Sequence, residues 1–290
     1  MGAADVVPGV SGGTIAFITG VYEELLNALA RVPEAAWLML RGQVKQAWQL
    51  ANANFLLTLF SGVLLSILSL ARLITWLLET QPIALWSFFF GLVLVSCVVV
   101  GRDVQRWRVS RYLVFALGAV LAWWVTVVTP LNWGHDPISL FAAGAIAICA
   151  MILPGISGSF ILLLLGLYPT LLLAVKQMEL SILVVFAGGC LFGLLAFARL
   201  LRAALQRYRD LTLAFLTGIM FGSLSKLWPW KNTLSWHTDR HGVAQPLLQE
   251  NISPWQFSEL FQVDAQLSLA VLLAVLGILL VWALERYADI

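Results

Sequence analysis

The hydrophobic pattern of this 290-residue chain is a series of long apolar runs separated by short polar connections. A transmembrane helix needs about 20 mostly apolar residues, whereas a spanning β-strand shows strict alternation of apolar and polar positions. Because lipid tolerates only helices and closed barrels, the unbroken runs predict spanning helices. These runs cover residues 54–79, 82–100, 111–128, 181–205, 210–228 and 266–284.

Two further apolar segments are interrupted by proline and glycine. Residues 5–22 read DVVPGVSGGTIAFITGVY, and residues 151–168 read MILPGISGSFILLLLGLY. The likeness continues downstream, where LARL at 70–73 matches FARL at 197–200. The sequence therefore predicts an internal duplication, with an additional amphipathic segment at 33–52 in its first half.

Basic residues predict the orientation of the chain, because Lys and Arg accumulate in cytoplasmic connections. Three connections are rich in them, and the others contain few, apart from Lys226 at a helix end. The three predicted cytoplasmic groups are Arg31, Arg41 and Lys45; Arg102, Arg106, Arg108 and Arg111; and Arg202, Arg207 and Arg209. This assignment places the C-terminus in the cytoplasm.

The same assignment determines the path of the broken segments. Residues 138–175 start and finish on the periplasmic side, so they must enter the membrane, turn near the proline and return. By the same logic, residues 1–30 form a hairpin that ends on the cytoplasmic side at Arg31. Because residues 138–146 have no counterpart before Met1, we also expect the natural reading frame to begin upstream.

The predicted fold is thus an all-α polytopic membrane protein with two inverted-topology repeats, each a re-entrant helix hairpin plus three transmembrane helices. Repeat one covers 1–128, with the hairpin 1–30, the segment 33–52 and the spans 54–79, 82–100 and 111–128. Repeat two covers 138–290, with the hairpin 138–175, the spans 181–205, 210–228 and 266–284, and a periplasmic loop at 229–264.

Composition agrees with the membrane class and excludes others. The chain is 61% hydrophobic and 11% charged, whereas soluble domains carry about 25% charged residues. A net charge of +2 without a basic, aromatic-rich run predicts no nucleic-acid partner. The three cysteines lie in apolar runs, and the HTDRH stretch at 237–241 lies in a polar loop, so neither predicts a metal site. No cofactor is expected.

The breaks have a chemical consequence. Proline ends a helix and glycine permits a sharp turn, so a new helix can begin after each break with Ser11 or Ser157 as its cap. The free N–H groups at such a start attract anions. The alternative is that each Pro-Gly pair only kinks a spanning helix. The inverted duplication favours paired anion sites near the membrane midplane.

Four charged residues are further candidates. Arg72 and Arg199 occupy matching positions inside apolar spans, where they either bind phosphate or extend to the headgroup region. Asp5, three residues before the first break, is either a proton-coupling carboxylate or a hydrogen-bond acceptor within the hairpin. Glu23 is a second coupling candidate, although an interfacial position near the cytoplasm is the simpler interpretation.

The doubled motif, PGVSGGTIAFITGVYEELL and PGISGSFILLLLGLY, resembles the bacterial polyprenyl-phosphate transporter family, PopT, over essentially the whole chain. This resemblance implies a flippase that returns undecaprenyl phosphate, the lipid carrier of cell-wall sugars, from the outer to the inner leaflet of the bacterial cytoplasmic membrane. It also implies that the motif positions bind the phosphate: Pro8, Gly9, Ser11, Gly12, Gly13, Thr14, Pro154, Gly155, Ser157, Gly158 and Ser159. It leaves the oligomeric state open.

Two alternative functions share these features. The motif is similar to the PGxSRS loop of undecaprenyl-pyrophosphate phosphatases, but Gly12 and Gly158 stand where that loop has arginine, and no E-x-x-x-E pair lies in an apolar span. The chemical groups for cleavage are therefore missing. A small-anion carrier or channel would use the same helix starts, and only a membrane-facing opening would distinguish it.

Overall fold

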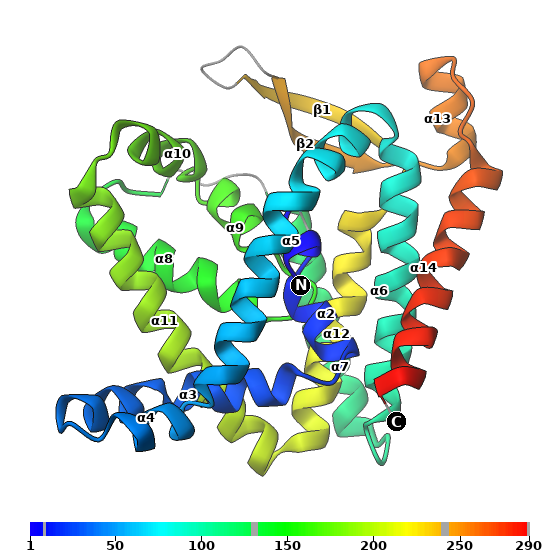
Figure 1. Ribbon diagram of the computed structural model, residues 1–290. Helices are drawn as coiled ribbons and strands as arrows, with labels where there is room; N and C mark the ends of the chain where they lie inside the picture. Colours follow the sequence, from blue (N-terminus) through cyan, green and yellow to red (C-terminus); the bar gives the residue numbers. More distant parts are fainter. Residues whose placement is uncertain (8–9, 129–132, 239–243, 289–290) are drawn as a thin grey trace.

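A computed structural model describes residues 1–7, 10–128, 133–238 and 244–288. Within these residues, six helices are long and apolar enough to cross a membrane, which confirms the expected α-helical polytopic class. The six helices are α5 (Ala53–Thr80), α6 (Pro82–Arg102), α7 (Val109–Val127), α11 (Leu180–Arg207), α12 (Arg209–Leu227) and α14 (Leu267–Ala288), and Figure 1 shows their arrangement.

The N-terminal segment contains the first broken stretch. It consists of α1 (Gly2–Asp5), α2 (Gly12–Ile18), α3 (Tyr22–Leu40) and α4 (Val44–Leu50). The helix α3 continues through Pro33, so one helix joins the end of the expected first hairpin to the amphipathic segment. In Figure 1, α3 and α4 extend sideways at the lower end of the molecule, and Trp37 and Leu40 on this extension are exposed.

The second broken stretch contains α8 (Pro137–Ile152), α9 (Gly158–Leu164) and α10 (Tyr168–Gln177). The side chain of Asp136 caps α8 by accepting a hydrogen bond from the N–H of Ser139. The axes of α9 and α10 differ by 108°. In Figure 1, α8 leads to the middle of the molecule, and α9 and α10 lead back to its upper end.

The region expected as a periplasmic loop has its own structure, which the sequence pattern did not predict. An antiparallel hairpin of β1 (Lys231–Thr238) and β2 (Ala244–Asn251) is followed by α13 (Pro254–Phe261). The Lys231 ammonium donates to the carbonyl of Lys226 at 2.6 Å, and the Asn251 amide donates to that of Ser225 at 2.7 Å. These contacts satisfy carbonyl groups that the end of α12 leaves unpaired.

The helices pack in three close pairs, α6 with α14, α7 with α12, and α8 with α11. Glycine makes each approach close. A Cβ atom added at Gly91, Gly218 or Gly189 would overlap a backbone carbonyl of the partner helix. Small residues at helix crossings are typical of membrane proteins, where packing replaces the hydrophobic effect between helices.

The largest buried cluster lies where α2 and α3 meet α6 and α12. Tyr22, Leu26, Val93, Leu216 and Met220 are each at most 2% exposed. By contrast, Leu65 and Leu68 on the outer face of α5 are 70% and 72% exposed. The molecule therefore surrounds the first broken stretch with packed helices and presents apolar side chains outward, as a lipid-facing surface requires.

Candidate functional site

The two broken segments meet each other. Helix α8 ends at the second break, so its last carbonyl groups have no partner within the helix. Ser11 donates through Oγ to the carbonyl of Leu153 at 3.1 Å and lies 3.3 Å from that of Met151. The Tyr22 hydroxyl donates to the carbonyl of Ile152 at 3.2 Å. The first segment thus caps the helix that leads into the second.

A second contact joins the motifs directly. The backbone N–H of Gly155 donates to Thr14 Oγ1 at 3.0 Å, and the Thr14 side chain is fully buried. Gly155 has a φ of +91°, in the left-handed region that favours glycine. A Cβ on Gly13 would lie 2.7 Å from the carbonyl oxygen of Ile152. The two glycine positions permit a joint too close for any larger residue.

The start of α2 is occupied by a carboxylate from the same chain. Asp5 accepts a hydrogen bond through Oδ1 from the N–H of Gly12 at 2.7 Å. Ser11 Oγ accepts another from the N–H of Gly13 at 3.1 Å. Of the two roles considered for Asp5, the structure thus provides the contacts of a hydrogen-bond acceptor.

The second motif faces α12 as well as the first motif. Ser157 Oγ lies 2.8 Å from Ser159 Oγ, Pro154 is buried, and Gly158 packs against the carbonyl of Ala147 on α8. On the α12 side, a cavity of about 10 Å³ separates this motif from Lys226. From sequence, Lys226 is only a basic residue at the end of an apolar run. Its place beside the motif depends on the packing of α12.

The other charged candidates lie away from this joint. Arg72 is exposed on α5, and the structure assigns it no hydrogen bond or ion pair within the described residues. Arg199 is exposed on α11 and donates through Nε to the carbonyl of Ala30 at 3.1 Å. Glu23 forms an ion pair with Arg209 at 2.7 Å, and both side chains are about half exposed.

Several expected positions are not covered. Pro8 and Gly9 of the first motif and His241 of the HTDRH stretch lie outside the described residues. Among the residues that are described, no group of three or more His, Cys, Asp and Glu side chains could hold a metal ion.

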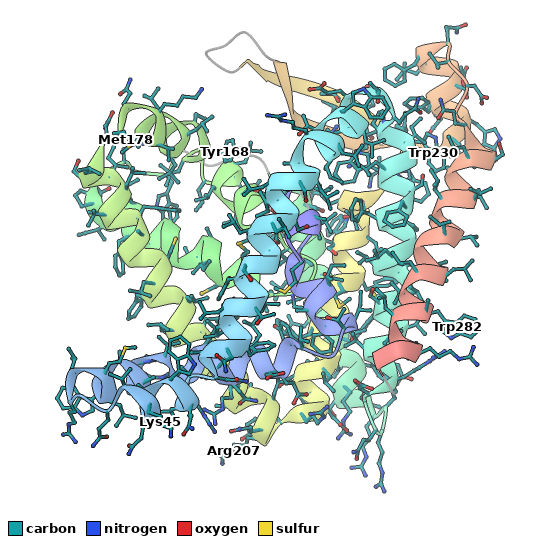
Figure 2. All side chains as sticks on the ribbon, in the orientation of Figure 1. Lys45, Tyr168, Met178, Arg207, Trp230 and Trp282 are labelled. Carbon is teal, nitrogen blue, oxygen red and sulfur yellow. The ribbon has the colours of Figure 1, made fainter. Side chains whose placement is uncertain are left out.

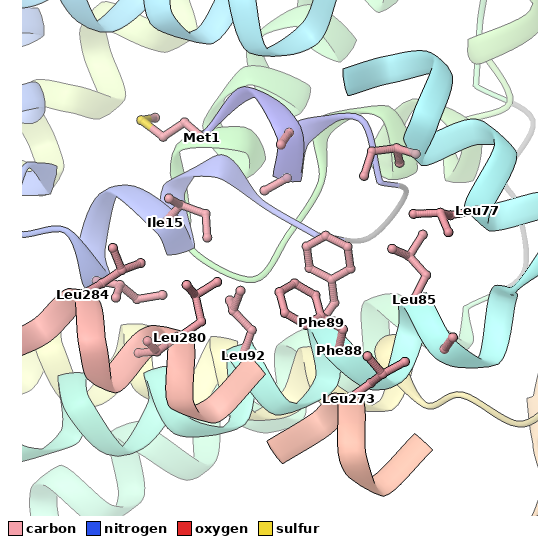
Figure 3. A pocket seen from close by; sticks show the side chains of 16 residues that line it. Met1, Ile15, Leu77, Leu85, Phe88, Phe89, Leu92, Leu273, Leu280 and Leu284 are labelled. Atoms are coloured by element: carbon pink, nitrogen blue, oxygen red, sulfur yellow. The ribbon is translucent and has the colours of Figure 1, made fainter. Parts of the chain in front are cut away.

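An apolar cavity of about 490 Å³ adjoins the first motif (Figure 3). Its walls come from α1, α2, α5, α6 and α14, and Ile15, Leu77, Phe88, Leu92 and Leu280 are among the side chains that line it. The side chains in its lining are apolar, so this cavity suits a hydrocarbon chain.

Replacing Thr14 with valine tests the contact between the motifs. Valine has nearly the same shape but cannot accept the hydrogen bond from Gly155, so a buried N–H loses its partner at a cost of about 1–3 kcal/mol. We expect a lower unfolding midpoint in detergent. Thr80→Val is the control, because the exposed Thr80 hydroxyl donates only to Trp76 of its own helix. Equal midpoints for the two variants would contradict a role of Thr14 in joining the motifs.

The fold and the joint define a polytopic membrane protein whose polar backbone breaks are buried among helices, an architecture shared by secondary transporters. Residues 1–245 match the model of the VCA0040-like family, described as undecaprenyl phosphate translocase-like, and the chain belongs to this family. The resemblance drawn from the doubled motif is therefore confirmed.

Two curated relatives agree with this assignment. A polyprenyl-phosphate transporter of Vibrio cholerae is 51% identical over 290 residues, which is 100% of this chain and 94% of the relative. A polyprenyl-phosphate transporter of Staphylococcus aureus is 30% identical over 251 residues, 79% of this chain and 83% of the relative. No solved structure matches the chain.

Proposed function

We propose that this protein moves undecaprenyl phosphate from the outer to the inner leaflet of the bacterial cytoplasmic membrane, without making or breaking covalent bonds. The observation that carries the proposal is the hydrogen-bonded pair of PGxSG motifs inside a multi-pass member of this family. A lipid phosphate needs a polar site within the membrane for its headgroup, and irregular backbone is tolerated there only when protein surrounds it.

The proposed architecture is the inverted repeat, with each broken segment acting as a re-entrant hairpin. The support for it is that helices of one half pack against helices of the other half in a reciprocal pattern. Because α6 packs against α14 and α12 packs against α7, the second spanning helix of each half contacts the third of the other half. Such reciprocal contacts are what a two-fold relation between the halves requires.

The proposed orientation places the lower end of the molecule in the cytoplasm, together with the C-terminus. In Figure 2, Lys45 and Arg207 lie at that end, whereas Met178 and Trp230 lie at the other. Arg102 and Arg111, at the lower ends of α6 and α7, add to the basic side. An excess of Lys and Arg in short connections favours the cytoplasmic side.

The proposed headgroup site is the region of the two motifs. In the conformation described, Ser11 donates to the carbonyl of Leu153, and the N–H of Gly155 donates to Thr14. These hydrogen bonds must break before the same groups can bind phosphate oxygens. Rocking of one repeat against the other would exchange protein contacts for contacts with the ligand. The proposed site does not include Arg72 and Arg199, because both are exposed and neither bonds to a motif.

The apolar cavity beside the first motif supports a lipid substrate over a small anion. A carrier of free phosphate needs no hydrocarbon-lined space of about 490 Å³ next to its polar site. A carrier of a lipid phosphate does need such a space, because the headgroup and the isoprenoid tail of the lipid enter together. We propose that part of the isoprenoid chain lies between α2, α6 and α14 when the headgroup is bound.

The leaflet distribution of the lipid tests this function. In cells without other transporters of this lipid, removal of the protein is expected to increase the undecaprenyl phosphate that a membrane-impermeant reagent labels at the outer surface. Expression of the wild-type chain should restore the original level. Unchanged labelling after removal would refute the proposal, and release of inorganic phosphate from undecaprenyl pyrophosphate by the purified protein would favour the phosphatase alternative instead.

A further inference from the structure

A small cavity lies between the second motif and α12, near the C-terminal end of α12, from which the chain leads into β1. Its volume is about 10 Å³, roughly the space that one water molecule needs. Three hydroxyl side chains, one glycine and one lysine line it together with four apolar residues. The lining residues include Gly155, Ser157, Thr126, Ser223 and Lys226.

The Lys226 side chain points toward the motif and not along α12 into the headgroup region. Its Nζ lies 4.6 Å from the ring centroid of Phe160, which belongs to α9, two positions after the PGISG sequence. Lysines near helix ends commonly extend outward to reach water. Lys226 instead crosses to the neighbouring segment, which brings its charge beside Ser157.

The charge of Lys226 has no acidic partner. Within the described residues, ion pairs join Arg102 to Glu285, Arg111 to Asp210 and Arg209 to Glu23, and none involves Lys226. A half-buried ammonium group among apolar side chains is unfavourable without a counter-charge. The Phe160 ring compensates this only partly, because a cation–π contact is weaker than a charged hydrogen bond.

A second lysine lies next to Lys226. The Lys231 ammonium lies 4.3 Å from the ring centroid of Trp86 and donates to the carbonyl of Lys226. Burial and the neighbouring charge of Lys226 lower the pKa of Lys231 to about 7. Repulsion between the two lysines adds to the cost of a charged Lys226, and an anion bound beside Lys226 would offset it.

We propose that Lys226 is the cation that binds the phosphate monoester headgroup next to the second motif, with Ser157 and Thr126 as neighbouring hydroxyl donors. This assignment rests on the proposed function and adds to it the residue that neutralises the substrate. A cavity that holds one water is too small for a phosphate group, so binding requires α9 and α12 to separate. The conformation described thus has this site closed.

Binding of two probes to the purified full-length protein tests the assignment. Farnesyl phosphate carries the headgroup on a short isoprenoid chain, and inorganic phosphate carries the headgroup chemistry alone. We expect Lys226→Gln to weaken farnesyl phosphate binding roughly tenfold or more, because a charge-assisted contact is lost. Lys226→Arg, which keeps the charge, should bind within a few-fold of wild type. Binding of inorganic phosphate that also depends on Lys226 would assign the contact to the headgroup without a requirement for the tail.

Two controls separate ligand binding from folding. Phe160→Leu removes the ring that packs on Lys226, so a purely structural lysine would make Phe160→Leu and Lys226→Gln equally harmful to stability and leave affinity unchanged. In the wild-type protein, farnesyl phosphate should protect Lys226 from an amine-acylating reagent, measured by mass spectrometry, while Lys45 stays reactive. This measurement needs no variant to fold.

The outcomes distinguish the two proposals. Equal affinity of wild type and Lys226→Gln for both probes, or no protection of Lys226, would overturn the role of Lys226 even if the protein moves undecaprenyl phosphate in cells. Unchanged leaflet distribution after removal of the protein would instead refute the transport function, whatever the probes show.

Discussion

Replacing Gly155 with alanine is expected to abolish transport and to destabilise the protein. At a φ of +91°, an L-residue costs about 1–2 kcal/mol more than glycine. The added Cβ would also lie 2.8 Å from Ser223 Oγ and 3.0 Å from the Cα of Met220, so α12 must move away. Overpacking of this kind costs a further 1–3 kcal/mol, roughly. The unfolding midpoint in detergent and the leaflet assay measure the two effects.

The control for this variant is Gly62→Ala in α5. A Cβ at Gly62 meets no atom within 4 Å, and alanine favours the helix over glycine. Its midpoint should equal or exceed that of the wild type, with transport retained. A Gly155→Ala protein as stable and active as Gly62→Ala would disprove the close approach of the second motif to α12.

The second large effect is expected for Gly13→Ala. The new Cβ would lie 2.7 Å from the carbonyl oxygen of Ile152, a backbone atom that cannot rotate away. The two motifs must therefore separate, which lengthens the hydrogen bonds from Ser11 to Leu153 and from Gly155 to Thr14. We expect loss of transport and faster hydrogen exchange at the amide of Gly155, measured by mass spectrometry.

Gly101→Ala is the matched control, because the nearest atoms to its Cβ, on Thr217 and Trp107, lie at ordinary contact distances of 3.7 and 3.8 Å. Its exchange pattern around Gly155 should match that of the wild type. If Gly13→Ala also leaves exchange at Gly155 unchanged, the contact between the motifs does not constrain the joint, and the assignment of Ser11 and Thr14 to this contact fails.

Much of the protein follows from local sequence patterns. Hydrophobicity over about 20 residues is a property of a continuous segment, so the six apolar runs could be recognised without knowledge of their partners. The duplicated motif is likewise visible in the chain itself, and its resemblance to PopT led to the family that the comparisons confirm.

The candidate site could be predicted only in part. Ser11 and Ser157 were each expected to cap the helix that follows. Ser11 Oγ does accept from the N–H of Gly13. Ser157, at the N-cap of α9, makes no side-chain cap hydrogen bond and contacts the Ser159 hydroxyl instead. The hydrogen bonds from Ser11 to the carbonyls of Met151 and Leu153 join residues about 140 positions apart in the sequence, and no local pattern encodes them. The β1–β2 hairpin was also missed, because strand pairing depends on a partner rather than on one segment alone.

The sequence by itself determined the membrane class, the spanning runs, the two backbone breaks and the family, because each depends on residues that are neighbours in the chain. Only the tertiary structure decided which groups satisfy those breaks. In the folded protein, Ser11 and Tyr22 donate hydrogen bonds to carbonyls at the end of α8, and Asp5 accepts one from the first N–H of α2. Lys226 lies beside the second motif. Buried polar groups bond to whatever packing brings near them, and packing joins residues that are distant in the chain.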